Sequence, residues 1–442
     1  MTRILAALAL VVTFFSAPVA YAVDVQEVTS PGGIKAWLIE DSSLPVTAIE
    51  FTFREHGAAL DPKGKEGLAD LTSSLIDEGA GDLDSQAFQG ALHDKSMRLS
   101  FYAGQDGFGG SFYSLNRYRD EGLDMLHLAL TKPRFDAEPV DRIRNQVLVG
   151  LKQRQTDPNF IAHKTLMAQL FPDHRYGRST DGTPESVSAI TVDDMRDFTR
   201  RAFTRKSLIV GVVGAVTADE LGPMLDRVFG DLPEGKPVVD TAKTDPVLSG
   251  GLTVVDMDVP QSAINFAQAG PDRSDPDFYA ATVLNYILGG GGFSSRLTDE
   301  IREKRGLVYS VYSSLYPRDE ASLWFGGAAT RNAKAKETVT VLRDQWREVA
   351  EKGVTAEEVK NAKTYLTGSY PLSFTNTSHI ASILVGIQRE DLGIDYINRR
   401  NNLIEAVTPG DVNRVAKKFL TPDKLSIVVV GRPDGLSTDG PS

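Results

Sequence analysis

The sequence lacks cysteine altogether among its 442 residues. Neither a disulfide framework nor a lipid-modified cysteine is therefore available, and the folded state must be stabilised by core burial alone. Runs of basic residues are also missing, and the formal net charge is -11. An acidic chain of this kind is poorly suited to binding nucleic acids or anionic membranes. The remaining candidates are a small substrate, a peptide or a protein partner.

The first 22 residues have the composition of a secretory signal peptide. Arg3 is followed by an apolar stretch from Ile4 to Phe15, and the segment ends with the small-x-small pattern Ala20-Tyr21-Ala22. The apolar stretch is too short to cross a bilayer comfortably, and no stop-transfer pattern follows it. We therefore expect cleavage before Val23 and a mature protein that is secreted, soluble and periplasmic.

The chain contains an internal repeat. Residues 189–214 align without a gap with residues 406–431. In each copy a threonine, Thr191 or Thr408, is placed to cap an amphipathic helix, and a β-branched strand that ends in glycine follows. The two copies lie about half a chain length apart, which is much longer than a solenoid repeat. The repeat therefore predicts two duplicated domains.

The connection between the copies, residues 233–250, is rich in proline, glycine and small polar residues, as expected of a linker. We predict an N-terminal domain at residues 23–232, a C-terminal domain at residues 251–435 and a tail at residues 436–442.

Each predicted domain begins with strand-like alternation of apolar residues. A weaker repeat relates these opening strands, at residues 45–51 and 260–266. Residues 97–115 are predicted to form a hairpin, and helices are expected at residues 138–155, 189–203, 333–351 and 355–368. Hairpins followed by helices indicate the α+β class. We expect each of the two duplicated domains to be a mainly antiparallel sheet covered on one face by helices.

Three segments resemble the pitrilysin or insulinase peptidase family, in particular its mitochondrial-processing-peptidase-like branch. They are GLADLTSSL at residues 67–75, YGRSTDGTPESVSAIT at residues 176–191 and GGGGFSSRLTDEIREKRGLVYSVYS at residues 289–313. The last is the most specific, because its order of glycines, serines, arginine and tyrosine is hard to obtain from generic helix-turn-strand patterns. The resemblance implies two similar domains across nearly the whole mature chain.

The zinc ligands of that family are missing here. Catalytic members carry H-x-x-E-H on the first of these helices, where two histidines one turn apart bind Zn²⁺ and the glutamate activates water. This chain has Asp70-Leu-Thr-Ser-Ser74 in their place, and no two of its six histidines are three or four residues apart. The helix that would supply the last ligand, residues 142–156, has no carboxylate, and Gly150 lies about where the glutamate belongs. We expect no metal site in this chain, and Asp70 to be a solvated surface residue.

The glycines Gly289, Gly290, Gly291 and Gly292 connect an apolar helix to a helix that starts near Ser294 or Ser295. They fit neither a phosphate loop nor a dinucleotide loop. Residue chemistry alone favours a mobile connector between the helices. The family resemblance implies instead that these glycines help to bind substrate, as a glycine-rich loop does in the non-metal subunits of processing peptidases.

Arg302 and Tyr309 are the candidate catalytic residues. Arg302 is expected in the last turn of a helix that Gly306 ends, and Tyr309 on the next strand, sharing one face with Leu307 and Val311. By spacing alone they are a helix-surface arginine and a core tyrosine. The resemblance implies that both donate hydrogen bonds to the substrate backbone and stabilise a developing oxyanion.

Two neighbouring arginines and two histidines receive simpler interpretations. Arg296 and Arg305 are read as helix-surface cations, because their distances from Tyr309 along the sequence do not match the family pattern. His56 and His174 are read as residues with local hydrogen bonds.

These observations predict the non-zinc-binding, substrate-binding subunit of a secreted heterodimeric zinc metallopeptidase. The partner subunit, a homologue with H-x-x-E-H, would supply Zn²⁺, and no cofactor is expected in this chain. The two chains would enclose an extended peptide or unfolded protein that adds a strand to a sheet edge. The alternative is a non-catalytic scaffold or peptide-binding protein, like the core subunits of respiratory complexes with this fold. A self-sufficient serine hydrolase has little support, because no G-x-S-x-G elbow is present.

Overall fold

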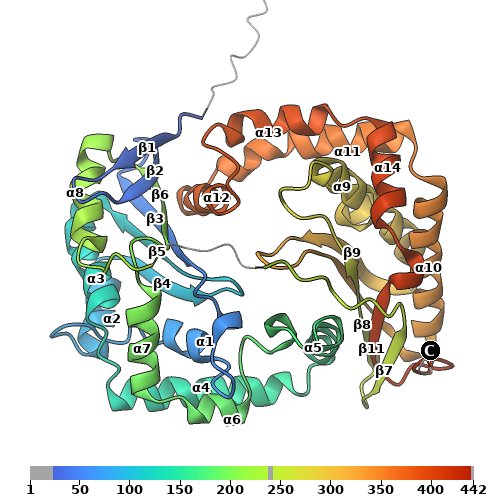
Figure 1. Ribbon diagram of the computed structural model, residues 1–442, viewed down its shortest axis with the longest axis horizontal. Coiled ribbons are helices and arrows are strands. Elements are labelled where there is room, and N and C mark those ends of the chain that lie inside the picture. Colours follow the sequence, from blue (N-terminus) through green and yellow to red (C-terminus); the bar gives the residue numbers. More distant parts are fainter. Residues whose placement is uncertain (1–22, 237–241, 440–442) are drawn as a thin grey trace, which may run out of the picture.

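The computed structural model describes residues 23–236 and 242–439, and the predicted signal peptide lies outside these ranges. Two sheets face each other across the molecule (Figure 1). The first has the strand order β1-β2-β6-β3-β5-β4 and the second the order β7-β11-β8-β10-β9. Strands of the first sheet are β1 (Gln26–Thr29), β2 (Lys35–Glu40), β3 (Val46–Arg54), β4 (Arg98–Ala103), β5 (Gly107–Leu115) and β6 (Leu208–Gly214). Strands of the second are β7 (Leu252–Asp256), β8 (Gln261–Ala269), β9 (Val308–Tyr316), β10 (Leu323–Arg331) and β11 (Ser426–Gly431).

Both sheets are mainly antiparallel, and each contains one parallel pair, β2 with β6 and β7 with β11. The predicted hairpin forms β4 and β5, with Arg98 opposite Tyr113. The weaker repeat also corresponds to equivalent strands, since its two copies form β3 and β8. The predicted α+β architecture with two similar sheets is confirmed.

Helices surround each sheet, and α3, α7 and α8 lie outside the first sheet as α10 and α14 lie outside the second (Figure 1). The first half contains α1 (Leu68–Ser73), α2 (Ser85–Asp94), α3 (Arg119–Thr131), α4 (Ala137–Arg154), α6 (Pro184–Ala189), α7 (Val192–Ala202) and α8 (Ala218–Phe229). The second contains α9 (Phe278–Asn285), α10 (Ala335–Lys352), α11 (Ala356–Gly368), α13 (Tyr396–Glu405) and α14 (Pro409–Phe419). Each half has its own apolar core, one within residues 28–232 and one within residues 252–429.

The two copies of the strong repeat fold alike. Thr191 accepts a hydrogen bond from the N–H of Asp194 at the start of α7, and Thr408 does the same for Asp411 at the start of α14. Both helices lead into strands, β6 and β11, that end in glycine. The prediction of one helix over residues 189–203 is wrong in one detail. Because Thr191 is an extended N-cap, the segment divides between the end of α6 and α7.

One helix from each half packs on the sheet of the other half. α5 (Pro158–Leu170) contacts β8 and β11, and α12 (Thr377–Arg389) contacts β3 and β6. Leu384 of α12, for example, is fully buried in a cluster with Ala48 and Val213. The expectation of sheets covered on one face is therefore incomplete. Eight of the nine residues of β3 are buried, because helices cover both of its faces.

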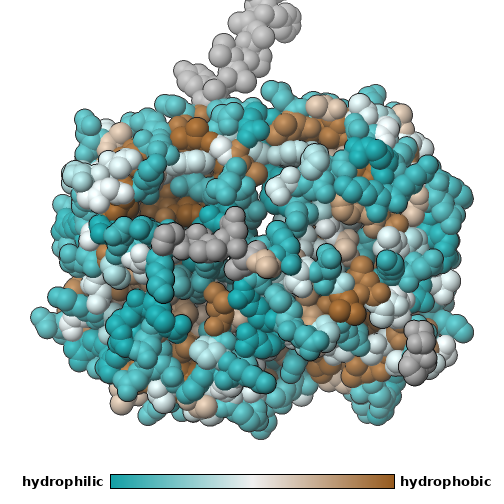
Figure 2. Space-filling model, viewed as in Figure 1, coloured by the Kyte–Doolittle hydropathy of each residue, from teal (hydrophilic) through white to brown (hydrophobic). Residues whose placement is uncertain are grey.

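No helix within residues 23–236 and 242–439 is both long and apolar enough to cross a membrane. The surface seen in Figure 2 is largely hydrophilic, and its apolar residues occur in separate patches.

Candidate functional site

The helix that corresponds to the zinc-binding helix is short but well anchored. Gly67 precedes it in the left-handed conformation, with φ 91°, and Asp61 accepts hydrogen bonds from the backbone N–H groups of Gly67 and Ala69. Asp61 is 3% exposed, and this burial raises its pKa to about 7. Leu68 and Leu71 are buried in the core of the first half. The helix is therefore packed into the core of the first half.

The helix is short and ends at Ser73. Thr72 donates its hydroxyl hydrogen to the carbonyl of Leu68, and both Ser73 and Ser74 donate to the carbonyl of Asp70. Such side-chain hydrogen bonds compete with continuation of the helical backbone. The residues that replace the zinc motif therefore also shorten the helix.

A pocket of about 300 Å³ lies between parts of α1 and α4. Its lining includes Asp70, Gln146, Gly150, Arg154 and Asp181. Asp70 is half-buried rather than a solvated surface residue. Burial and the nearby carboxylate of Asp181 raise the pKa of Asp70 to about 6, although Arg154 opposes the rise. Arg154 also pairs with Asp181 at 2.5 Å. A Cβ on Gly150 would have no other atom within 4 Å. The pocket is therefore open at the position where the family resemblance implies a glutamate ligand.

Among residues 23–236 and 242–439 no three histidine, cysteine or carboxylate side chains converge as a metal site would require. The pocket offers two carboxylates and an arginine that neutralises one of them. Hydrolytic zinc sites use neutral imidazoles and a carboxylate around an open position. The residues of this pocket do not fit that ion.

The four glycines divide between the end of a helix and the turn that follows it. α9 continues as a wider helical turn over Tyr286–Gly290, and Gly289 is buried against β9, where a Cβ would lie 2.4 Å from the Ser313 hydroxyl oxygen. Only Gly292 has a positive φ, 55°. The prediction of a free connector is therefore wrong for the first two glycines, which belong to the helix. Gly291 and Gly292 make the turn that presents Phe293 to solvent, with Phe293 71% exposed.

Arg302 lies between two exposed aromatic rings. Its guanidinium carbon is 4.5 Å from the ring centre of Phe293 and 5.4 Å from that of Tyr309. Arg302 belongs to a helical segment, Thr298–Glu303, which Gly306 ends with φ 58° and a hydrogen bond from its N–H to the Arg302 carbonyl. The predicted helix end is confirmed.

Tyr309 is 85% exposed, so the prediction that it shares a buried face with Leu307 and Val311 is wrong. The cause is a β-bulge. Val311 pairs with Ala328, but Val308 pairs with Thr330, so Tyr309 and Ser310 together lie opposite one residue of β10. The extra residue turns both side chains away from the core while Val308 and Val311 stay buried. The bulge thus exposes Tyr309 beside Arg302, which is half-buried.

We name Phe293, Arg302 and Tyr309 the aromatic-arginine cluster. Sequence reasoning found Arg302 and Tyr309 but missed Phe293, although its place directly after four glycines is a signal for an exposed ring. β9 is an edge strand of the second sheet, and two more of its tyrosines, Tyr312 and Tyr316, are 48% and 44% exposed. The cluster therefore stands at one end of an aromatic edge strand.

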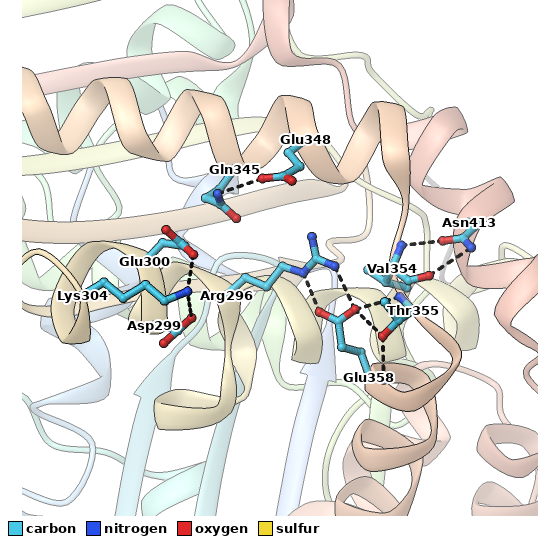
Figure 3. A network of polar contacts seen from close by, with 10 residues as sticks. All are labelled: Arg296, Asp299, Glu300, Lys304, Gln345, Glu348, Val354, Thr355, Glu358 and Asn413. Atoms are coloured by element: carbon cyan, nitrogen blue, oxygen red, sulfur yellow. Dashed lines mark hydrogen bonds and ion pairs between the residues drawn. The ribbon is translucent and has the colours of Figure 1, made fainter.

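Arg296 is not a surface cation as expected. Its Nε and Nη2 atoms donate to the two carboxylate oxygens of Glu358, at 2.6 and 2.8 Å (Figure 3). Burial would raise the pKa of Glu358, but the hydrogen bonds from Arg296 and Thr355 outweigh it and lower that pKa to about 2. This pair fixes the helical segment that carries Arg302 to the start of α11. Arg305 pairs with Glu300 on the same segment and remains a surface cation.

His174 has one local partner, as expected, and one that is distant in the sequence. Its Nδ1 atom accepts a hydrogen bond from the N–H of Tyr176, and its Nε2 atom lies 2.9 Å from Glu320. His56 is half-buried, and this burial lowers its pKa to about 4, so its imidazole is neutral near pH 7.

Comparison with known proteins gives a consistent result. The family described as "Peptidase M16 inactive domain" matches residues 189–366, which include the glycines, Arg302 and Tyr309. The "Non-peptidase homolog YmxG" of Helicobacter pylori is 27% identical over 398 residues, 88% of this chain and 90% of that protein. An uncharacterized zinc protease of Streptomyces coelicolor is 30% identical over 72% of this chain and 68% of that protein.

Solved structures agree with these relatives. A crystal structure of a peptidase M16 inactive domain from Pseudomonas fluorescens has a TM-score of 0.87 and 27% identity, and covers 95% of this chain and 100% of that one. A protease from Helicobacter pylori has a TM-score of 0.84 at 17% identity, over 93% of this chain and 100% of that one, and shows the same fold. From its motifs, fold and relatives, the chain belongs to the M16 peptidase family, the pitrilysin and insulinase family.

Proposed function

We propose that this chain is the non-zinc-binding, substrate-binding subunit of a two-chain metallopeptidase. The partner is a homologue that carries H-x-x-E-H and Zn²⁺, and peptide hydrolysis belongs to the pair. The observation that carries the proposal is the exposure of the aromatic-arginine cluster. A tyrosine that served only the fold would not be turned out of the core by a bulge to stand beside an arginine.

The donors of the cluster are free to meet a substrate. Arg302 contacts two rings and lies 3.6 Å from its neighbour Glu303, which leaves most of its guanidinium hydrogens uncommitted. Within residues 23–236 and 242–439 the Tyr309 hydroxyl has no hydrogen-bond partner. Arginine provides a rigid fork of N–H donors, and a tyrosine hydroxyl can donate to a carbonyl that becomes negative. We infer that both donate to the scissile peptide while the partner supplies the metal-activated water.

An extended peptide is the substrate that such an arrangement would bind. The edge strands β4 and β9 each have one side without a neighbouring strand in their sheets. A peptide could add there through main-chain hydrogen bonds, with Gly291 and Gly292 permitting its close approach beside Phe293. We propose an unfolded peptide segment, bound as an added strand.

The relative called a non-peptidase homologue supports the view that this chain does not hydrolyse peptides alone. It also favours a second candidate function, a peptide-binding protein that never meets a zinc-binding partner. The two candidates differ in whether the aromatic-arginine cluster takes part in turnover.

Mixing the two chains tests the proposal. We expect no cleavage of an unstructured peptide by this chain alone and no stoichiometric zinc in it, and strong cleavage when the zinc-binding homologue is added. Metal content is measured on each purified chain by atomic spectroscopy. Cleavage by this chain alone, abolished by a chelator, would contradict the division of labour. A homologue that is fully active alone and does not respond to this chain would favour the peptide-binding alternative.

We also propose export to the periplasm, based on the signal-peptide pattern of residues 1–22. Asn398 accepts the Val23 N–H at 3.0 Å and donates to the Val23 carbonyl at 2.9 Å, so the fold holds the chain from the residue that follows the proposed cleavage point. We expect the intact mass of protein purified from the periplasm to match a chain that begins at Val23. An uncleaved mass, or recovery from the cytoplasm only, would contradict this.

A further inference from the structure

The connection between β9 and β10 holds an arginine that the proposed function does not use. Arg318 is 8% exposed, and its guanidinium carbon lies 5.2 Å from the ring centre of Tyr176 and 4.3 Å from that of Tyr316. The guanidinium is charged at every pH at which the protein is folded. It is thus a buried charge between two aromatic rings, one from each half of the chain.

Arg318 forms no ion pair with any residue that the structure describes, and its Nε and Nη1 atoms are shielded from solvent without a hydrogen-bond partner. The side-chain nitrogen of Gln105, from the turn between β4 and β5, is also buried without a partner. Buried charges in proteins are normally paired. Both groups are donors, so what they lack is an acceptor.

Both residues line one small cavity at the junction of the two halves. It has a volume of about 70 Å³ and also borders on Lys164, Ser179 and Asp181. This space exceeds what one water needs. Waters could satisfy the hydrogen bonds of Arg318 but would leave its charge unpaired. A small anion with several acceptor oxygens satisfies both.

The carboxylates nearest to the cavity are engaged elsewhere. Asp106 accepts the Tyr176 hydroxyl at 2.6 Å and the backbone N–H of Asp319 at 3.3 Å. Asp181 pairs with Arg154, and Glu320 pairs with Arg175 and His174. Arg178, the other arginine at the cavity, donates to the carbonyls of residues 59 and 61. The chain therefore directs two donors into the cavity and keeps its own nearby acids occupied.

We propose that this cavity is an oxyanion site, in which Arg318 and Gln105 bind a carboxylate or phosphate group. A guanidinium presents paired N–H donors that match two oxygens of either group. The bound oxyanion joins the first half, through Gln105, to the second half, through Arg318. The inference does not depend on the peptidase partnership, because every residue it uses belongs to this chain.

Thermal unfolding of the full mature chain tests the site. We expect sodium phosphate, sodium acetate or a short peptide with a free C-terminal carboxylate to raise the unfolding temperature in chloride buffer of matched ionic strength. The peptide with a C-terminal amide is the control for the last of these. If only phosphate raises the unfolding temperature, the cavity binds a free inorganic ion. If only the free-acid peptide raises it, the cavity binds a peptide carboxylate.

Substitutions locate the effect. Arg318→Met is expected to weaken binding of the responding anion roughly ten- to a hundredfold, the loss typical of a charge-assisted hydrogen bond. Gln105→Met, which keeps the guanidinium, is expected to weaken it by less. The matched control is Arg98→Met, since Arg98 is also stacked on a tyrosine, 4.4 Å from the Tyr113 ring centre, but is exposed.

Two results would overturn the proposal. One is a wild-type chain that none of the three probes stabilises at matched ionic strength. The other is a loss of response in Arg98→Met as large as in Gln105→Met. If Arg318→Met does not fold, the comparison of wild type with Gln105→Met and Arg98→Met still decides between these outcomes.

Discussion

Arg302→Ala is expected to lower the kcat of the reconstituted two-chain enzyme by roughly a hundred- to a thousandfold, which is the effect of removing one oxyanion-stabilising donor. Association of the chains should be unchanged, because within residues 23–236 and 242–439 Arg302 pairs only with its neighbour Glu303. Tyr309→Phe, which removes only the hydroxyl, is expected to lower kcat by roughly tenfold or more. Steady-state kinetics on an unstructured peptide, with saturating partner, measures both effects.

Arg305→Ala is the matched control for these variants. Arg305 lies three residues from Arg302 and pairs with Glu300 on the surface of the same helical segment. It should leave kcat unchanged within a factor of about two, since exposed ion pairs of this kind contribute little. If Arg302→Ala and Arg305→Ala behave alike, the aromatic-arginine cluster has no role in turnover, and the chain acts as a binding protein or scaffold.

Gly211→Val is expected to destabilise the chain by about 3 kcal/mol or more, because the new side chain would collide with a helix of the other half. A Cβ at Gly211 of β6 would lie 2.7 Å from the carbonyl oxygen of Ala381 and 2.9 Å from the Cβ of Leu384, both in α12. Relief requires α12 to move off the first sheet, which would expose a cluster of fully buried aliphatic side chains. Urea unfolding measures the loss.

Hydrogen exchange and a second glycine make the test specific. In Gly211→Val the amides of α12 should exchange faster than those of α10, which packs within the second half. Gly386→Ala is the control, because Gly386 lies in α12 itself and a Cβ there has no other atom within 4 Å. It should stabilise the protein by about 0.5–1 kcal/mol, the usual gain on replacing a helical glycine. Equal midpoints for Gly211→Val and wild type would show that α12 is not held against β6.

Much of the fold could be predicted from local patterns. The threonine caps, the hairpin at residues 97–115 and the long helices α4, α10 and α11 follow from periodicity and capping, which act over a few residues. The packing of α5 and α12 on the sheet of the other half could not be predicted in this way. An apolar helix face shows that it needs a partner but not which sheet will provide it. The almost wholly apolar strand β6, LIVGVVG, is a local sign of a second covering layer.

The candidate site shows the same limit. The missing zinc ligands and the Arg302–Tyr309 spacing are properties of the sequence, so they were readable directly. The exposure of Tyr309 depends on one unmatched residue in the pairing of β9 with β10, which strict alternation cannot reveal. The role of Arg296 depends on Glu358, which is distant in sequence but adjacent in space.

The reciprocal packing of α5 and α12 has a consequence for dividing the chain into fragments. Each half buries apolar residues of its sheet beneath a helix of the other half. Neither half could therefore be removed without exposing part of the remaining sheet. Either half produced alone is therefore expected to be unstable.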